Sequence, residues 1–397
     1  MTGPDGLAAL RRQLDGIDAG LVELIAQRYD VVAGIAAAKA GSDSPVRDPR
    51  REREVLDAVE AMATAHGVSG ELVRRIFREI IGHSVDRQVA ELLGTSERAV
   101  AVAFQGVEHA YSHLAAQKHV GGRGWQATYR GLPSFAAVVD ELVSGGCDVA
   151  VLPVENTTAG SINQVYDLLQ ASPVHVVGEE TWRVDHVLAA RTEVPLDRLR
   201  RVLSHPQGLE QCAAFLRTLP QAAPTHVFDT AEAMREVAGH DGDDWAAIGA
   251  QEAADAYGLV VLRRHLADRA ENYTRFLVLA REPLVVGPRV ACKTSVVLVT
   301  RHEEGALLRC LEVLARAEHS MTKLESRPRP GRPFEYLFFL DFEGNAAQER
   351  TRQVLDALRR SALSLKVLGS YPAKVVRPPS DSARDIDALE AVVEPPA

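Results

Sequence analysis

The chain has 397 residues, of which 46% are hydrophobic and 25% are charged, and its formal net charge is −9. This length is enough for two or three domains, each with a core of its own. The negative charge argues against nucleic acid or an anionic membrane as the main partner. The N-terminal residues show no secretory signal pattern, and no stretch has the eighteen or so consecutive apolar residues of a membrane span. We therefore expect a cytoplasmic protein.

The four cysteines, Cys147, Cys212, Cys292 and Cys310, lie far apart in the sequence. No C-x-x-C pair suggests a zinc site or a redox couple. The G-x-G-x-x-G and P-loop patterns of nucleotide-binding proteins are also absent. The sequence therefore predicts buried, reduced thiols, no metal site and no cofactor.

Residues 1–95 have the pattern of an all-helical unit. Apolar residues recur there at steps of three and four, at Leu7, Leu10, Leu14, Ile17, Leu21 and Leu24. A helix that continues to about Lys39 would be about 50 Å long at 1.5 Å per residue. Nothing else in so small a domain could cover that length, so we expect it to pair with a second copy of the chain. Two further helices are predicted, from about Pro49 to His66 and from a cap at Ser69 to about Leu93.

Residues 98–282 alternate short apolar strands with helix candidates, which predicts an α/β sheet covered by helices. The strand candidates are Ala99–Phe104, Asp148–Pro153, His175–Val177, His186–Ala190, Arg201–Leu203, Ala246–Ile248 and Phe276–Ala280.

A linker at Pro283–Pro288 precedes a third unit at residues 290–376, which has a predicted βαββαβ order typical of the ferredoxin-like arrangement. Its elements are predicted at Thr294–Thr300, Gly305–Glu318, Thr322–Ser326, Glu335–Phe342, Ala347–Ser361 and Leu365–Leu368. Residues 377–397, rich in Pro, Ser, Asp and Glu, are predicted to be a disordered tail.

Polar residues interrupt the helical pattern of the first unit. Arg28 and Lys39 lie within about 20° of one another around the first helix, whereas Arg11 lies about 100° away from Arg28. Ser84 and Gln88 are i,i+4 neighbours on the third helix. A solvated surface with ion pairs would explain any one of these residues. As a set they suit a dicarboxylate, because arginine binds carboxylates through two parallel hydrogen bonds.

The first unit resembles the all-helical chorismate mutase family. The positions that carry the resemblance are Arg11, Arg28, Lys39, Asp48, Arg51, Glu52, Ser84 and Gln88. The resemblance implies an intertwined dimer that rearranges chorismate to prephenate, with Arg11 supplied by the partner copy. It also implies that Arg11 and Arg28 clamp the substrate carboxylates and that Glu52 takes the ring hydroxyl. Lys39 and Gln88 would donate to the breaking ether oxygen.

In the central unit, small polar groups follow apolar runs at several places. One is the stretch E-N-Y-T-R-F at residues 271–276, which precedes a predicted strand, and others are residues 106–113, 153–161 and 204–207. Each of these stretches alone could be a helix cap or a turn. In open α/β sheets, however, such loops converge on a ligand beyond the carboxyl ends of the strands. The amides of Gly160 and Ser161, read as the start of a helix, could hold a carboxylate.

With residues 246–258, these stretches resemble the prephenate dehydratase family over about residues 98–282. The resemblance implies a two-lobed fold like that of bilobal solute-binding proteins and a reaction that gives phenylpyruvate by loss of carbon dioxide and the ring hydroxyl. Thr274 is expected to donate to the departing hydroxyl. Side chains expected to contact or orient the substrate are Glu155, Asn156, Ser161 and Gln207. Arg275 is expected either to hold a substrate carboxylate or to pair with Glu155. The first loop departs from the family, because His109 stands where glycine is usual.

The third unit resembles the ACT amino-acid-sensing domain. Its marks are Gly305-Ala306-Leu307 at a helix start and Glu325-Ser326-Arg327-Pro328 at a strand end. The resemblance implies that phenylalanine binds between two such domains and inhibits the dehydratase. The turn at residues 302–304 carries two carboxylates where many relatives have an Asn…Pro turn, which could weaken capture of the effector's carboxylate. A dimerisation module without a ligand is the alternative.

Together these resemblances predict a bifunctional chorismate mutase and prephenate dehydratase that acts on small molecules as a homodimer or higher oligomer. A prephenate decarboxylase, which retains the hydroxyl, is a neighbouring alternative that Thr274 disfavours. A catalytically silent amino-acid sensor is an alternative of another class. A prephenate dehydrogenase is disfavoured, because the dinucleotide pattern is absent. Direct transfer of prephenate between the two sites stays open.

Overall fold

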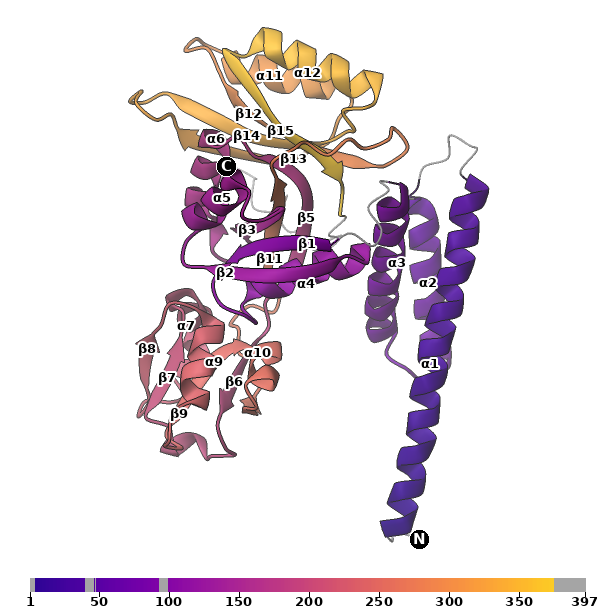
Figure 1. Cartoon of the computed structure of the whole chain (residues 1–397), viewed down its shortest axis with the longest axis vertical. Helices are drawn as coiled ribbons and strands as arrows, with labels where there is room; N and C mark the ends of the chain where they lie inside the picture. Colours follow the sequence, from indigo (N-terminus) through magenta and orange to yellow (C-terminus); the bar gives the residue numbers. More distant parts are fainter. Residues whose placement is uncertain (1–3, 40–45, 47, 93–98, 375–397) are drawn as a thin grey trace, which may run out of the picture.

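The computed structural model describes residues 4–39, 46, 48–92 and 99–374, which form a helical unit, a two-lobed unit and a C-terminal sheet covered by helices (Figure 1). The predicted tail at residues 377–397 lies outside these described residues. No helix within the described ranges is long and apolar enough to cross a membrane. The same part of the chain holds no group of three or more potential metal ligands.

The helical unit consists of α1 (Pro4–Lys39), α2 (Pro49–Ala65) and α3 (Gly70–Leu92), so the three predicted helices are confirmed. Asp48 caps α2, because its carboxylate accepts the N–H groups of Arg50 and Arg51 at 3.1 Å each. The N-terminal part of α1 extends past the other two helices (Figure 1). Its apolar stripe is bare there: Leu10, Leu14 and Ile17 are 64%, 57% and 54% exposed.

The first lobe of the central unit is built on a sheet of order β2-β1-β3-β11-β5, with the short β4 paired to β3. β2 and β3 run parallel to β1, whereas β11 is antiparallel to both of its neighbours. The elements are β1 (Ala99–Gln105), α4 (Tyr111–Arg123), β2 (Gln126–Leu132), α5 (Phe135–Ser144), β3 (Val149–Asn156), β4 (Gly160–Ser161), α6 (Asn163–Ala171), β5 (His175–Arg183) and β11 (Tyr273–Ala280).

The second lobe is inserted between β5 and β11, so the chain crosses from one lobe to the other twice. Its sheet has the order β10-β6-β9-β7-β8. The elements are β6 (His186–Ala190), η1 (Leu196–Arg198), β7 (Arg201–Ser204), α7 (Pro206–Gln211), α8 (Ala213–Leu216), β8 (Ala223–His226), α9 (Thr230–Ala238), β9 (Trp245–Ala250), α10 (Gln251–Ala256) and β10 (Val260–Arg263).

All seven predicted strands of this unit are present, but two expectations about their ends are wrong. The strand predicted to begin at Phe276 begins at Tyr273, so Thr274 and Arg275 lie inside β11 and not at its entrance. Gly160 and Ser161 pair with Asn156 and Glu155 as β4, and α6 begins only at Asn163. The amides of Gly160 and Ser161 therefore do not form a helix N-terminus.

The C-terminal unit has the predicted βαββαβ order and a sheet of order β13-β14-β12-β15 with antiparallel neighbours. Its elements are β12 (Cys292–Val299), α11 (Ala306–Arg316), β13 (Met321–Pro328), β14 (Tyr336–Glu343), α12 (Glu349–Ser361) and β15 (Ser364–Pro372). The two helices cover one face of the sheet (Figure 1).

The other face packs on the first lobe. The rings of Tyr166 and Phe339 lie 4.7 Å apart, and Leu368 belongs to the same apolar core as the first-lobe residue Leu169. At Gly369 a Cβ atom would lie 2.0 Å from the carbonyl oxygen of Val176, so the close approach of the two backbones requires glycine there.

Lys374, just after β15, joins all three units. Its ammonium group donates to Asp86 of α3 at 2.8 Å and also to Glu180 of β5. Glu180 is fully buried; burial alone would raise its pKa, but Lys374 overrides this and the pKa is lowered to about 2. The ammonium therefore stays paired with an ionised carboxylate.

The four cysteines are buried, as predicted. Burial raises the pKa of the Cys147 thiol to about 11 and that of the Cys212 and Cys292 thiols to about 12. Because the thiolate is the reactive form, these cysteines have packing roles.

Candidate active sites

A cavity of about 180 Å³ lies between the two lobes of the central unit. Of the predicted site residues, Asn156, Gln207 and Thr274 line it. Other polar residues that line the cavity include Tyr111 and Ser112 of the first lobe and His186, Gln211 and Asp229 of the second. The polar loops therefore converge between the lobes, as the argument from strand ends predicts.

Strand β11 carries Thr274 to this cavity. Side chains alternate across a strand, so Thr274 and Phe276 face the cavity while Arg275 points to the opposite side of the sheet. Against β3 the pairing shifts register between Arg275 and Phe276, which leaves Val154 of β3 without a partner in the ladder. Thr274 is only 9% exposed, so its hydroxyl lies in a nearly dry environment.

A hydrogen bond from Asn156 sets the direction of the Thr274 hydroxyl. The carboxamide nitrogen of Asn156 donates to Thr274 Oγ1 at 2.9 Å and to Asn272 Oδ1 at 2.8 Å. The oxygen of Asn156 accepts the Thr158 hydroxyl at 2.6 Å and the N–H groups of Thr158 and Ala159 at 2.9 Å each. Since Thr274 accepts from Asn156, its own hydrogen is left for a group in the cavity.

The network continues across the lobes through Gln211. The carboxamide oxygen of Gln211 accepts from Asn272 Nδ2 at 2.9 Å and from His186 Nε2 at 3.0 Å. The hydroxyl of Tyr111, in the first lobe, donates to His186 Nδ1 at 3.0 Å. Burial lowers the pKa of His186 and raises that of Tyr111 well above its usual value, so both stay neutral. This uncharged chain holds the lobes in register around Thr274.

Two residues of this network, His186 and Gln211, lie outside the polar stretches that the sequence singles out. Tyr111, Thr158 and Asn272 lie within those stretches but are not among the predicted site residues. His186 was assigned only to a strand, and no motif pointed to its ring. Gln211 lies four residues after the predicted Gln207 on α7, so the i,i+4 rule that paired Ser84 with Gln88 could have found it.

The N-terminus of α4 lies at the edge of the cavity. Its N-cap residue is Ala110, which makes no side-chain cap, and Ala110, Tyr111 and Ser112 all line the cavity. The first amides of a helix carry a partial positive charge and lack partners within the helix. They can therefore bind a carboxylate of a substrate between the lobes.

His109 precedes this helix in a left-handed conformation, with φ 66°. A residue with a Cβ is strained there, which explains why glycine is usual at this position. Its ring does not line the cavity but lies 5.7 Å from the ring of Tyr257 in the second lobe. The histidine therefore makes a contact between the lobes.

Asp229 is the acidic residue among those that line the cavity. Its carboxylate caps α9 by accepting the N–H of Ala231 at 2.7 Å, and burial raises its pKa to about 6. A Cβ atom at Gly106 would lie 2.5 Å from Asp229 Oδ2. Glycine at this position therefore lets the first lobe approach the acid of the second.

The structure places Arg275 outside the cavity and away from Glu155. Its guanidinium donates to Glu179 at 2.8 Å and to Asp341 of the C-terminal sheet at 2.7 Å. Although Arg275 stands opposite Glu155 in the strand register, Glu155 pairs with Lys323 at 3.1 Å. Arg275 therefore neither reaches the cavity nor pairs with Glu155, because strand alternation turns it to the far face of the sheet.

Glu155 and Ser161 also face the C-terminal sheet. Ser161 Oγ donates to Glu325 Oε2 at 2.5 Å, and Lys323, the partner of Glu155, lies on the same strand β13 as Glu325. Neither residue lines the cavity. The structure therefore does not place these two predicted substrate contacts in the site.

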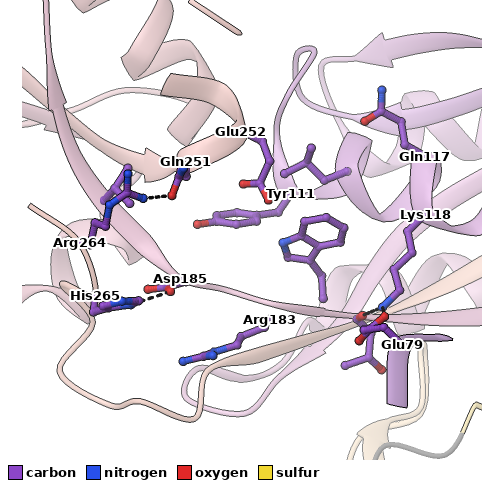
Figure 2. A pocket seen from close by; sticks show the side chains of 14 residues that line it. Glu79, Tyr111, Gln117, Lys118, Arg183, Asp185, Gln251, Glu252, Arg264 and His265 are labelled. Carbon is purple, nitrogen blue, oxygen red and sulfur yellow. Dashed lines mark hydrogen bonds and ion pairs between the residues drawn. The ribbon is translucent and has the colours of Figure 1, made fainter. Parts of the chain in front are cut away.

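A larger cavity of about 670 Å³ is also lined by Tyr111 (Figure 2). Figure 2 shows charged side chains around it, several of which are already paired. His265 bonds Asp185 at 2.8 Å, Arg264 bonds Gln251, and Lys118 lies 3.7 Å from Glu79. No predicted site residue lines this cavity, so the smaller one is the candidate site.

In the helical unit, α1 and α3 bring predicted residues together. Arg28 Nη1 donates to Ser84 Oγ at 3.0 Å, and Gln88 Nε2 lies 3.5 Å from the carbonyl oxygen of Val32. Arg11 is exposed and lies seventeen residues before Arg28, about 25 Å along the helix. One copy of the chain therefore cannot bring Arg11 and Arg28 to one small ligand.

The remaining predicted residues of this unit lie near the start of α2. Asp48 is its N-cap, Glu52 is half-buried, and the exposed Arg51 donates to Glu54 at 3.2 Å. The side chain of Lys39 lies outside the described residues.

The predicted effector residues occupy two places in the C-terminal unit. Gly305, with φ 70°, is the N-cap of α11, and Ala306 and Leu307 form its first turn beside a cavity of about 510 Å³. Glu303 of the preceding turn pairs with Arg309 at 2.5 Å. The stretch Glu325–Pro328, including Ser326 and Arg327, ends β13.

Comparison with known proteins agrees with this arrangement. Residues 10–89 match the family model of chorismate mutase type II, and residues 102–284 match that of prephenate dehydratase. These matches define a class of enzyme in which a mutase precedes a dehydratase on one chain. The chain belongs to the bifunctional chorismate mutase/prephenate dehydratase family of phenylalanine biosynthesis, and it is an enzyme with both activities.

Similar proteins cover most of the chain. The bifunctional enzyme of Enterobacter agglomerans is 37% identical over 380 residues, which is 94% of this chain and 98% of that protein. The prephenate dehydratase of Arthrobacter aurescens, solved in complex with L-Phe, is 26% identical with a TM-score of 0.63, covering 74% and 98% of the two chains. The quorum-quenching acylase GqqA is 31% identical with a TM-score of 0.62, covering 69% and 98%.

Proposed function

We propose that Thr274 donates a hydrogen bond to the leaving hydroxyl of prephenate. The observation that carries this proposal is the bond from Asn156 to Thr274, which leaves the threonine hydrogen free within the cavity. Prephenate loses its ring carboxylate as carbon dioxide, and the electron pair of that bond enters the ring as the bond to hydroxide breaks. Formation of an aromatic ring drives the reaction. The site has only to hold the substrate and stabilise the departing oxygen.

A neutral donor suits this step. A cation beside the reacting carboxylate would stabilise it in the ground state and oppose its loss. Thr274 is neutral, and the guanidinium of the adjacent Arg275 points to the opposite side of the sheet. The amides at the start of α4 would hold a carboxylate of prephenate, while Asn156, Gln207 and Gln211 would orient the ring.

For the mutase we propose a dimer in which Arg11 of one copy acts with Arg28 of the other. The exposed apolar stripe on α1 supports pairing, since a bare stripe of this length needs an apolar partner. The rearrangement needs no proton transfer, so the site has to clamp the two carboxylates and stabilise charge on the ether oxygen. Lys39 and Gln88 would donate to that oxygen. Ser84 would hold Arg28 in place.

We also propose that the C-terminal unit is an ACT domain and that phenylalanine, bound between two such domains, inhibits the dehydratase. The βαββαβ order and the Gly305 turn support this reading, as does the L-Phe complex of the Arthrobacter relative. The pairing of Glu303 with Arg309 neutralises one of the two carboxylates of the altered turn. Phenylalanine at millimolar concentrations should lower the dehydratase rate. An unchanged rate would leave the domain with a structural role alone.

The two activities are tested by feeding chorismate to the purified chain and identifying the products. The proposal expects phenylpyruvate, with prephenate as an intermediate. Lys39→Ala should abolish mutase turnover while the dehydration of added prephenate survives. A product that retains the ring hydroxyl would indicate a decarboxylase, and unchanged chorismate and prephenate would indicate a binding protein.

A further inference from the structure

A buried cluster of charges lies on the face of β11 opposite the cavity. Arg275 donates from Nε to Glu179 Oε2 at 2.8 Å, from Nη1 to Asp341 Oδ2 at 2.7 Å, and from Nη2 to the hydroxyl of Tyr371 at 3.1 Å. Glu179 belongs to the first lobe, whereas Asp341 and Tyr371 belong to the C-terminal sheet. One guanidinium therefore bonds to both units at once.

The partners of Arg275 are themselves held in place. Ser295 Oγ donates to Asp341 Oδ1 at 2.5 Å and bonds the Tyr371 hydroxyl at 2.7 Å. Lys293 Nζ donates to the two carboxylate oxygens of Glu179 at 2.9 and 2.8 Å. The side chains of Glu179, Asp341 and Arg275 are 3%, 10% and 16% exposed. Two cations and two anions thus balance in a nearly dry space, where loss of one partner leaves an unpaired buried charge.

Side chains support β11 on the side where its backbone pairing is irregular. The register shift against β3 falls between Arg275 and Phe276, whereas the pairing with β5 continues without a shift from Tyr273 to Val278. Asn156 holds the threonine from the cavity side, and Arg275 holds the next residue from the other side. A misplacement of about 1 Å at a reacting group can cost about 10²-fold in rate.

We propose that Arg275 is a positioning residue for the dehydratase, which clamps the strand that carries Thr274 to Asp341 of the C-terminal sheet. Dehydratase turnover then depends on the docking of that sheet, although the sheet contributes no residue to the cavity lining. This inference rests on the proposed role of Thr274.

A role for Arg275 in binding substrate makes a different prediction. An arginine that held a substrate carboxylate would raise KM when shortened, and Asp341 would not matter, since it lies on another unit. A positioning residue affects kcat, and its partner on the C-terminal sheet shares the effect.

The test uses the full chain with prephenate as substrate. The variants change either Arg275 or Asp341, the two partners of the clamping bond. Asp341→Asn and Arg275→Lys are each expected to lower kcat at least tenfold with KM within twofold. The double variant is expected to lose little more than either single variant, because both remove the same bond. The chorismate mutase rate and the melting temperature report whether each variant is folded.

The matched control is Lys366→Met. Lys366 also joins the C-terminal sheet to the first lobe, since its ammonium donates to the carbonyl oxygens of Leu169, Gln170 and Ser172. It does not contact β11 through any of these bonds. Its replacement is expected to leave kcat within twofold, and a loss equal to that of Asp341→Asn would overturn the specific role of Arg275.

Other outcomes also decide the question. An unchanged kcat in Asp341→Asn, or a rise in KM alone in Arg275→Lys, would overturn the proposal. If Asp341→Asn does not fold, Ser295→Ala is the substitute, because it removes the hydrogen bond from Ser295 to Asp341 and leaves the carboxylate itself in place. We expect this variant to lower kcat about threefold. An unchanged kcat in Ser295→Ala counts against the clamp. Thr274→Val separates the two ideas. If it is inactive while Asp341→Asn is normal, only the positioning inference fails, whereas an active Thr274→Val removes the proposed role of the threonine.

Discussion

Asn156 and Thr274 share a hydrogen bond of 2.9 Å in which the amide is the donor. The direction follows from the other contacts of Asn156, because its carboxamide oxygen already accepts three hydrogen bonds from the turn at Thr158 and Ala159. The amide orientation is thus set by its surroundings. The threonine oxygen is occupied as an acceptor, and its hydrogen is available to a ligand.

Replacement of the threonine hydroxyl by a methyl group should stop the dehydration. Thr274→Val keeps the shape of the side chain but removes the donor, so kcat for prephenate is expected to fall by about 10²–10⁴-fold with KM little changed. Thr274→Ser should retain most of the activity. Phenylpyruvate formation measures the effect, and the mutase rate of the same sample should stay at the wild-type value. A valine variant that turns over normally would refute the assignment.

Asn156→Asp should reverse the bond without disturbing the turn. A carboxylate can still accept from Thr158 and Ala159, but it would accept from Thr274 as well and capture the hydrogen that the substrate needs. We expect kcat to fall at least tenfold. Asn156 is buried, so the new charge should also lower the melting temperature. Asn156→Ala is the matched control for lost contacts, and an aspartate variant with normal kcat would contradict the proposed direction.

A charge in the apolar stripe of α1 should separate the copies of the chain. Leu14→Glu places a carboxylate among exposed apolar residues such as Ile17 and Leu21. We expect a monomer by light scattering, with mutase activity lowered at least a hundredfold because Arg11 can no longer reach the site of the other copy. Arg12→Glu, on the opposite face of the helix, should leave the dimer intact. A dimeric, active Leu14→Glu would be evidence against the pairing.

Asp229 should make stability depend on pH. Its folded pKa is raised from 3.8 to about 6, so the folded state holds the proton more tightly, and the free energy of unfolding falls as pH rises between these values. At about 1.4 kcal/mol per pKa unit, the loss is about 3 kcal/mol. Asp229→Asn keeps an oxygen that can accept the N–H of Ala231 but removes the titrating group, so its free energy of unfolding should not fall in this pH range. Urea unfolding at pH 4 and pH 7 measures the effect. The free energy of unfolding of the variant, relative to that of the wild type, should be higher at pH 7 than at pH 4. The same difference at both pH values would contradict the raised pKa of Asp229.

Gly369→Ala should loosen the C-terminal sheet from the first lobe. The added methyl would meet the carbonyl oxygen of Val176 at 2.0 Å, and backbone must move to accommodate it. Overpacking of this kind typically costs about 1–3 kcal/mol. We expect a lower melting temperature and a lower dehydratase rate. Gly287→Ala, where a Cβ would meet nothing within 4 Å, is the control and should be neutral.

Much of the fold was predictable because the central strands are apolar on both faces. The strands that the sequence missed, β2, β8 and β10, all lie at sheet edges. Edge strands carry polar residues or proline, as in Gln126–Leu132 and Ala223–His226, and their apolar signal is correspondingly weak. The two-residue β4 is too short to show a pattern.

The sequence predicts site residues whose side-chain type the chemistry requires. It does not predict as well which way those side chains point. Thr274 and Asn156 stand in stretches whose polar character is visible in the chain. Strand β11 begins at Tyr273, three residues before the predicted start, so Arg275 lies inside the strand. Side chains alternate along a strand, and Arg275 therefore points to the face opposite Thr274 and Phe276. Contacts such as that of Ser161 with Glu325 depend on how two units dock, which no local pattern encodes.

The position of Lys374 has a practical consequence for anyone who divides this enzyme into parts. A chain that ends at residue 373 would keep every side chain assigned to either reaction, together with every strand of the C-terminal sheet. It would nevertheless lack the Lys374 ammonium, which binds Asp86 of the mutase helix and Glu180 of the dehydratase. A boundary drawn where the last strand ends would therefore remove a contact that three units share, and separately produced pieces should include this lysine.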